Sequence, residues 1–163
     1  MTVTENRLRK TEFIPFIDCS DTPNTPDWGR IDKATIFAMA AGPQSESLDY
    51  ISTEVPVEEV MNYIPELPSE IALYQGNKVY DRLFKMFYDL PIGTGVYLPF
   101  LMCFGGTDKK AWKTSATVLL GALDTVAGML SFTLKIGGNI ERGTYVINEG
   151  KPVFSANTTP LEP

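Results

Sequence analysis

The chain offers few side chains suited to acid–base, nucleophilic or metal chemistry. It contains no histidine, which removes the commonest general base, the usual partner of a nucleophilic serine or cysteine, and the most frequent metal ligand. The adjacent carboxylates Glu58 and Glu59 are of the type that performs acid and base catalysis in glycosidases. Neighbouring residues on an extended segment point to opposite sides, so we do not expect these two to converge on one substrate.

Cysteines and glycines form no ligand-binding pattern either. Cys19 and Cys103 are far apart and lack the paired spacing of a metal site. The chain opens without secretory signal features, so we expect a reducing compartment and free thiols. It contains neither a phosphate-binding glycine loop nor a dinucleotide-binding glycine motif. The sequence therefore predicts no catalytic, cofactor or metal site, and a protein that is not an enzyme.

Charge is distributed unevenly along the chain. The formal net charge is −6, which argues against a surface built to bind nucleic acid phosphates, because such surfaces need clustered Lys and Arg. No basic residue lies between Lys33 and Lys78, whereas this interval contains the acidic residues Glu46, Asp49, Glu54, Glu58, Glu59, Glu66 and Glu70. Basic residues gather near the start, as Arg7, Arg9 and Lys10. Both segments are candidates for contacts between subunits; the simpler alternative is a solvated loop face and a free arm.

A few aromatic residues add to these contact candidates. Aromatics at helix or strand spacing usually belong to the core, but Trp28, Tyr50 and Trp112 lie in surroundings that suggest exposure or loops. Tyr and Trp are enriched where subunits meet. The predicted inter-subunit contacts are Arg7, Arg9, Lys10, Trp28, Tyr50, Ile51, Glu54, Glu58 and Glu59.

One segment has a clear helical repeat. Its apolar residues at i, i+3, i+4 and i+7 are Tyr80, Leu83, Phe84 and Phe87. Polar residues occupy the opposite stripe, as in an amphipathic helix. Asn77 is placed to cap the first free amides, and Pro91 disfavours helical geometry at Leu90. We expect a helix over about residues 77–90, with its four apolar side chains buried against a sheet of the same subunit.

The other regular segments are predicted strands. Residues 129–136 alternate apolar and polar side chains, as in a strand with one buried face. Residues 96–104 are apolar at both odd and even positions, so both faces of this strand should be covered. Glycine-rich turns are expected at 105–108 and at 137–139, where the second would close a hairpin into 140–148. Further strands are expected at 13–18, 35–41, 70–74, 111–123 and 153–154.

The chain is predicted to form a single domain of 163 residues. An N-terminal arm (1–12) and a C-terminal tail (155–163) flank it. The acidic passage 42–69 contains four prolines, so we expect a long loop of extended segments with irregular links, which in a small domain is usually functional. The apolar run 96–104 is too short to cross a bilayer as a helix, which needs about 20 residues.

Three short motifs occur in order along the chain. They are T-P-D-W at 25–28, G-P-Q-S-E-S-L-D-Y-I at 42–51, and Y-Q-G-N-K-V-Y-D at 74–81. Their order and spacing, together with the later hairpins, resemble the tail tube proteins (major tail proteins) of long-tailed, non-contractile bacteriophages of Gram-positive bacteria. The resemblance covers about residues 13–154. No single motif encodes chemistry.

The resemblance implies a mainly β tail tube fold, in which two packed antiparallel sheets form a barrel-like sandwich with one flanking α-helix at about residues 77–90. It also implies a structural virion protein. Six copies would form a ring, and rings would stack through the long loop and the arms into a tube that conducts double-stranded DNA from capsid to host.

The resemblance extends to partners and location. Expected partners are further copies of the chain, the tape measure protein, and tail terminator or distal tail proteins, with no cofactor and no membrane. The expected location is the virion tail, and the host cytoplasm during assembly. Two alternatives stay open: the inner tube of a contractile tail or injection system, and a monomeric β-barrel that binds a small apolar ligand.

Overall fold

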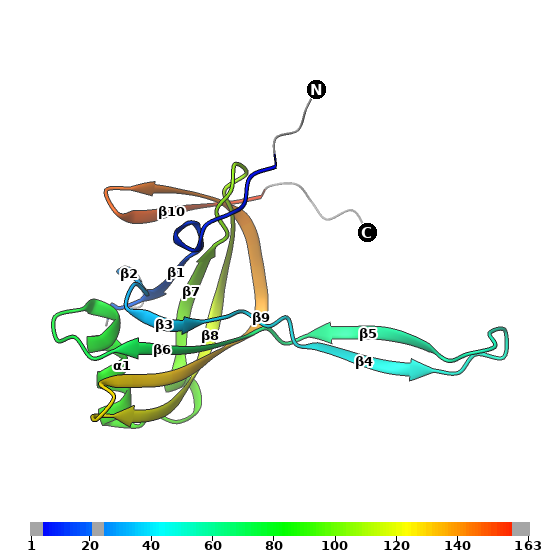
Figure 1. Ribbon diagram of the computed structural model, residues 1–163, viewed down its shortest axis with the longest axis horizontal. Helices are drawn as coiled ribbons and strands as arrows, with labels where there is room; N and C mark the ends of the chain where they lie inside the picture. Colours follow the sequence, from blue (N-terminus) through cyan, green and yellow to red (C-terminus); the bar gives the residue numbers. More distant parts are fainter. Residues whose placement is uncertain (1–4, 21–24, 158–163) are drawn as a thin grey trace.

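The computed structural model describes residues 5–20 and 25–157 and shows a mainly β protein with one α-helix (Figure 1). The main sheet has eight antiparallel strands, in the order β2-β1-β7-β8-β9-β6-β3, with β10 paired to β9. It curls into a half-barrel. Its strands are β1 (Ile14–Asp18), β2 (Trp28–Arg30), β3 (Ala34–Phe37), β6 (Glu66–Ala72), β7 (Tyr97–Cys103), β8 (Lys110–Asp124), β9 (Met129–Asn148) and β10 (Lys151–Ala156).

A second, two-stranded sheet consists of β4 (Pro43–Leu48) and β5 (Val57–Tyr63), and it projects away from the half-barrel (Figure 1). The extended segments predicted within 42–69 are present, but they pair into a regular hairpin and the start of β6, so the prediction of a long loop is wrong for most of its length. Three of its four prolines lie at the ends of strands: Pro43 begins β4, Pro56 precedes β5, and Pro65 separates β5 from β6. The fourth, Pro68, lies inside β6 opposite Thr133. Proline is tolerated at the first residue of a strand and on edges, so the first three positions permit a regular hairpin.

The hairpin predicted at 137–139 is also absent, because β9 runs unbroken from Met129 to Asn148. β8 pairs with β9 on both sides of the glycines, with Ser115 opposite Gly137 and Lys113 opposite Glu141. More residues lie between these positions on β9 than on β8, and the register shifts there. The glycines thus form a bulge that bends a long strand rather than a turn between two short ones.

The main hydrophobic core lies between the inner face of the half-barrel and the helix α1 (Lys78–Asp89). The sheet contributes fully buried side chains that include Leu67, Phe100 and Leu134. A second, smaller cluster covers the other side of β7 and contains Phe16, Leu101, Cys103, Ala111 and Tyr145. Both faces of β7 are therefore covered from Phe100 to Cys103, as its apolar pattern predicts, whereas Tyr97 and Pro99 leave one face of its first half exposed.

The helix buries a stripe centred on Leu83. Its buried residues are Val79, Leu83 and Met86, while Tyr80 and Phe87 are partly buried against the same core. The prediction is wrong for Phe84, which is 39% exposed. One residue corresponds to a rotation of about 100° around the axis, so Phe84 lies at the margin of the Leu83 stripe. There its ring stacks on Tyr80 with a centroid distance of 5.8 Å.

Both helix ends lie where the sequence places them. The Asn77 side-chain oxygen accepts hydrogen bonds from the backbone amides of Val79 (3.1 Å) and Tyr80 (3.3 Å). The Asn77 amide group also donates to Asp32 at 3.0 Å. Leu90 adopts a left-handed conformation with φ 48°, next to Pro91, and ends the helix. None of the described helices is long and apolar enough to cross a membrane.

We expect Asn77→Ala to lower the free energy of unfolding by about 1–2 kcal/mol, because the helix loses its N-cap and Asp32 loses a donor. Chemical denaturation followed by circular dichroism measures this change. Gln75→Ala, at an exposed residue two positions earlier, serves as the control and should change stability by less than about 0.5 kcal/mol. An equal effect of the two substitutions would contradict the capping role.

Candidate interaction surface

The β4–β5 hairpin is a regular antiparallel pair that stands free of the core. Its register places Leu48 opposite Val57 and Glu46 opposite Glu59, with a shift between Gln44 and Ser45. Near its end, the Thr53 amide donates to the Tyr50 carbonyl at 3.1 Å and closes a turn. At its base, the Ile64 amide donates to the Gly42 carbonyl at 3.0 Å, so the two ends of the hairpin meet where it leaves the half-barrel.

The hairpin exposes an unusual number of large apolar side chains. Leu48 is partly buried, and every other residue of β4 and β5 is exposed. The exposed apolar residues of the hairpin and its base are Tyr50, Ile51, Val55, Val57, Val60, Met61, Tyr63 and Ile64. An isolated two-stranded hairpin is marginally stable in water, and large exposed apolar patches mark interaction sites. The hairpin therefore has the properties of a surface that is completed by a partner.

The hairpin is also uniformly acidic, since no basic residue lies between Lys33 and Lys78. Glu46 and Glu59 are direct cross-strand neighbours, and like charges in this position are destabilising. Two hydrogen bonds hold carboxylates in place: the Ser45 hydroxyl donates to Glu58 at 2.7 Å, and the Tyr50 hydroxyl donates to Glu59 at 3.1 Å. A positively charged partner surface would relieve this repulsion.

The structure separates the predicted contact residues into three places. Tyr50, Ile51, Glu54, Glu58 and Glu59 are all exposed on the hairpin. The exposed basic residues Arg7, Arg9 and Lys10 lie on the N-terminal segment, away from the hairpin of the same chain (Figure 1). The two tryptophans are half-buried within the subunit. Trp28 packs on the smaller cluster, and Trp112 packs edge-on against Phe104 with a centroid distance of 5.0 Å.

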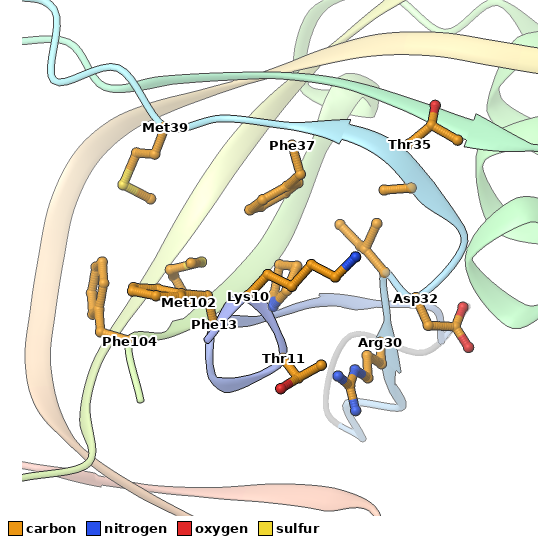
Figure 2. Close-up of a pocket in the computed structure, with 13 residues that line it drawn as sticks. Lys10, Thr11, Phe13, Arg30, Asp32, Thr35, Phe37, Met39, Met102 and Phe104 are labelled. Carbon is orange, nitrogen blue, oxygen red and sulfur yellow. The ribbon is translucent and has the colours of Figure 1, made fainter. Parts of the chain in front are cut away.

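A groove that the sequence does not predict lies where the two ends of the curled sheet face each other. Figure 2 shows side chains of Phe37 and Met39 on one side and of Met102 and Phe104 on the other, all directed into the same space. The groove has a volume of about 620 Å³. We call it the seam groove. Its residues come from three segments, 10–15, 30–39 and 102–104, which only the folded chain brings together, so no local pattern reveals it.

Chemically reactive groups are few in the described part of the chain. No cluster of three or more His, Cys, Asp or Glu residues there is arranged to hold a metal ion. Cys103 is buried and Cys19 is half-buried, and both thiols are free. Burial raises the pKa of Cys103 to about 12. Burial, reinforced by the nearby Asp27 carboxylate, raises the pKa of Cys19 to about 11. Both groups are poor nucleophiles at neutral pH.

We expect Cys103 in the native protein to react with Ellman's reagent at pH 8 at least about 100-fold more slowly than in the denatured chain, because it is buried and protonated. Its folded pKa lies above its unfolded value near 9. The thiol therefore stabilises the fold fully below about pH 9, and this contribution is lost as the pH rises toward 12. Rapid native labelling of both thiols would contradict the structure.

Comparison with known proteins shows a likeness of fold without a likeness of sequence. No protein-family model and no curated protein matches the sequence. Several solved structures match the fold, and they include chains of gene transfer agent particles and of an extracellular contractile injection system.

Three of these structures illustrate the likeness. A chain in the tail of an empty gene transfer agent (GTA) particle with C6 symmetry has a TM-score of 0.58 and 6% identity, covering 82% of this chain and 97% of its own. A chain of the native GTA virion has a TM-score of 0.56 and 7% identity, covering 83% and 98%. A chain from the sheath/tube terminator of an extracellular contractile injection system has a TM-score of 0.51 and 9% identity, covering 86% and 99%.

Proposed function

We propose that this chain is the structural subunit of a tail tube. Six copies form a ring, and stacked rings form a tube through which double-stranded DNA passes from capsid to host. The observation that carries the proposal is the exposed, apolar and acidic hairpin projecting from a half-barrel whose fold resembles a chain of a GTA tail and a chain of a GTA virion. Such a subunit is incomplete alone and is suited to self-assembly rather than catalysis.

The open half-barrel supports a ring. β2 and β3 form the two ends of the strand order, so each has one neighbour in the sheet. Exposed edges promote uncontrolled pairing unless they are covered, and closure into a ring covers them. Neighbouring copies on both sides would protect these edges and join the half-barrels into one continuous wall.

The outer face of the main sheet suits the lumen of such a tube. On β6 and β9 the side chains that point away from the helix include Glu66, Glu70, Thr133 and Lys135. Lys135 forms an ion pair with Glu66 at 3.1 Å, which neutralises its charge locally. A conduit for DNA should avoid free Lys and Arg, because every phosphate contact adds salt-dependent affinity. The net charge of −6 likewise favours passage without binding.

Size-exclusion chromatography with negative-stain electron microscopy of the purified chain tests the proposal. Six-fold rings or tubes are the expected result. A monomer of 18.0 kDa at every concentration would refute it. Mixing experiments with a tape measure protein, a tail terminator or a distal tail protein would then test these proposed partners of a virion tail that assembles in the host cytoplasm.

The basic arm gives a second prediction. Because the hairpin is acidic and the arm is basic, we propose that the arm of one subunit meets the hairpin of the next. Reversing Arg7, Arg9 and Lys10 to Glu should abolish tube formation at low salt, as measured by sedimentation and microscopy. The charge-retaining variant with Arg7→Lys, Arg9→Lys and Lys10→Arg should assemble normally. Unchanged assembly of the Glu variant at low salt would exclude this pairing.

Specific observations favour two other functions. The likeness to a chain of a contractile injection system favours the inner tube of a contractile tail or injection system; microscopy with a candidate sheath protein would separate this from a bare tube. The volume of the seam groove lies within the range of about 300–1,000 Å³ typical of small-molecule sites. A monomer that retains an apolar ligand through purification would favour a ligand-binding protein.

A further inference from the structure

The seam groove combines an apolar floor with a basic rim. Met102 is buried, while Phe37, Met39 and Phe104 are half-buried and face the groove. At the rim, the exposed side chains of Lys10 and Arg30 supply positive charge, partly offset by the exposed Asp32. Figure 2 shows Lys10 extended across the same space. A surface of this kind suits a segment with apolar side chains flanked by carboxylates.

The tip of the hairpin, residues 49–56, has the complementary composition. Ile51 is fully exposed and Val55 is 72% exposed, although both are large and apolar. The exposed carboxylates of Asp49 and Glu54 lie next to them in the sequence. The tip contains no basic residue. Transfer of these apolar side chains from water into an apolar site would lower the free energy, and a basic rim would attract the acidic groups beside them.

The tip of a hairpin cannot reach the groove of its own chain. β4 and β5 stay paired from Pro43 out to Leu48 and Val57, and the hairpin points away from the half-barrel (Figure 1). At about 3.3 Å per residue, Ile51 lies about 25 Å from the base of the hairpin. The partner is therefore another copy of the chain.

We propose that the hairpin tip of one copy occupies the seam groove of a second copy. Ile51 and Val55 then cover the apolar floor, and Asp49 and Glu54 face Lys10 and Arg30. The proposal rests on the proposed tube and specifies its ring-to-ring contact. A small apolar ligand would use the floor but leave the basic rim without a partner.

Disulfide cross-linking tests the contact directly. A protein with Ile51→Cys is mixed with one carrying Met39→Cys, assembled, and oxidised with copper phenanthroline. We expect a dimer on non-reducing gels that disappears on reduction, at a yield at least about ten-fold above the control, because docking holds the two thiols together. The control replaces Ile51→Cys by Val126→Cys, since Val126 is 99% exposed but lies in the turn between β8 and β9.

A charge swap provides an independent test. Lys10→Glu with Arg30→Glu should raise the critical concentration for assembly at least about ten-fold, and adding Asp49→Lys with Glu54→Lys should restore it. All four residues are exposed, so thermal unfolding should stay unchanged and exclude misfolding. Failure of the swap to restore assembly would overturn the charge pairing.

The outcomes separate this contact from the proposed function. Tubes that form without cross-linking above the control overturn the contact and leave the tube intact. An unmodified chain that stays monomeric overturns both. A monomer whose groove retains an apolar ligand overturns the contact in favour of a ligand site.

Discussion

Excision of the β4–β5 hairpin is expected to abolish assembly and leave the half-barrel folded. None of the buried residues of either hydrophobic cluster comes from residues 43–63, so the cores keep all their contacts. Gly42 and Ile64 already meet through a backbone hydrogen bond of 3.0 Å. An Asn-Gly turn in place of 43–63 can therefore close the chain without strain, since this dipeptide is the preferred two-residue hairpin turn.

Two measurements check this prediction. Thermal unfolding followed by circular dichroism should show a cooperative transition close to that of the intact chain, and electron microscopy should show no tubes at concentrations at which the intact chain assembles. When the excised variant is mixed with the intact chain, it should be incorporated into tubes only at low yield. Tubes built from the excised variant alone would show that the hairpin is dispensable, whereas loss of the cooperative transition would show that the hairpin belongs to the folding unit.

The second large effect is expected at the helix, where two neighbouring residues should behave differently. Leu83 is fully buried beneath the helix, so Leu83→Ala removes apolar contacts and leaves a cavity, which should cost about 3 kcal/mol of the free energy of unfolding. Phe84 is 39% exposed and its ring stacks on Tyr80, so Phe84→Ala should cost about 1 kcal/mol.

Urea denaturation of both variants measures the difference. Phe84→Ala is the matched control for Leu83→Ala, because it removes a larger side chain from the adjacent position of the same helix. Equal losses of stability would mean that the helix is rotated toward Phe84. The critical concentration for tube assembly gives a further comparison. Phe84→Ala should leave it unchanged if the Phe84 ring is stabilised only by Tyr80. The substitution should raise it if a neighbouring subunit covers Phe84.

Local features of the fold could be predicted from the sequence because they depend on nearby residues. The helix between Asn77 and Leu90 follows from a 3.6-residue repeat, a capping side chain and a following proline. The long strands follow from apolar alternation, and the apolar pattern of β7 on both of its faces predicts that its second half is covered on both sides. Charge segregation is likewise visible in the sequence alone and makes the acidic residues of the hairpin contact candidates, which stays a prediction.

Tertiary structure decided what depends on pairing between distant segments. Residues 137–139 have the composition of a hairpin turn, but β8 pairs on both sides of them and keeps β9 continuous. The face that α1 buries depends on where Leu83 meets the sheet, and the regular hairpin within 42–69 depends on the match between β4 and β5. The seam groove exists only because the curl of the sheet brings β3, at one end of the strand order, opposite β1 and β7 near the other end. Periodicity reports which side of an element is apolar, whereas register and curvature are set by the strands that pair with it.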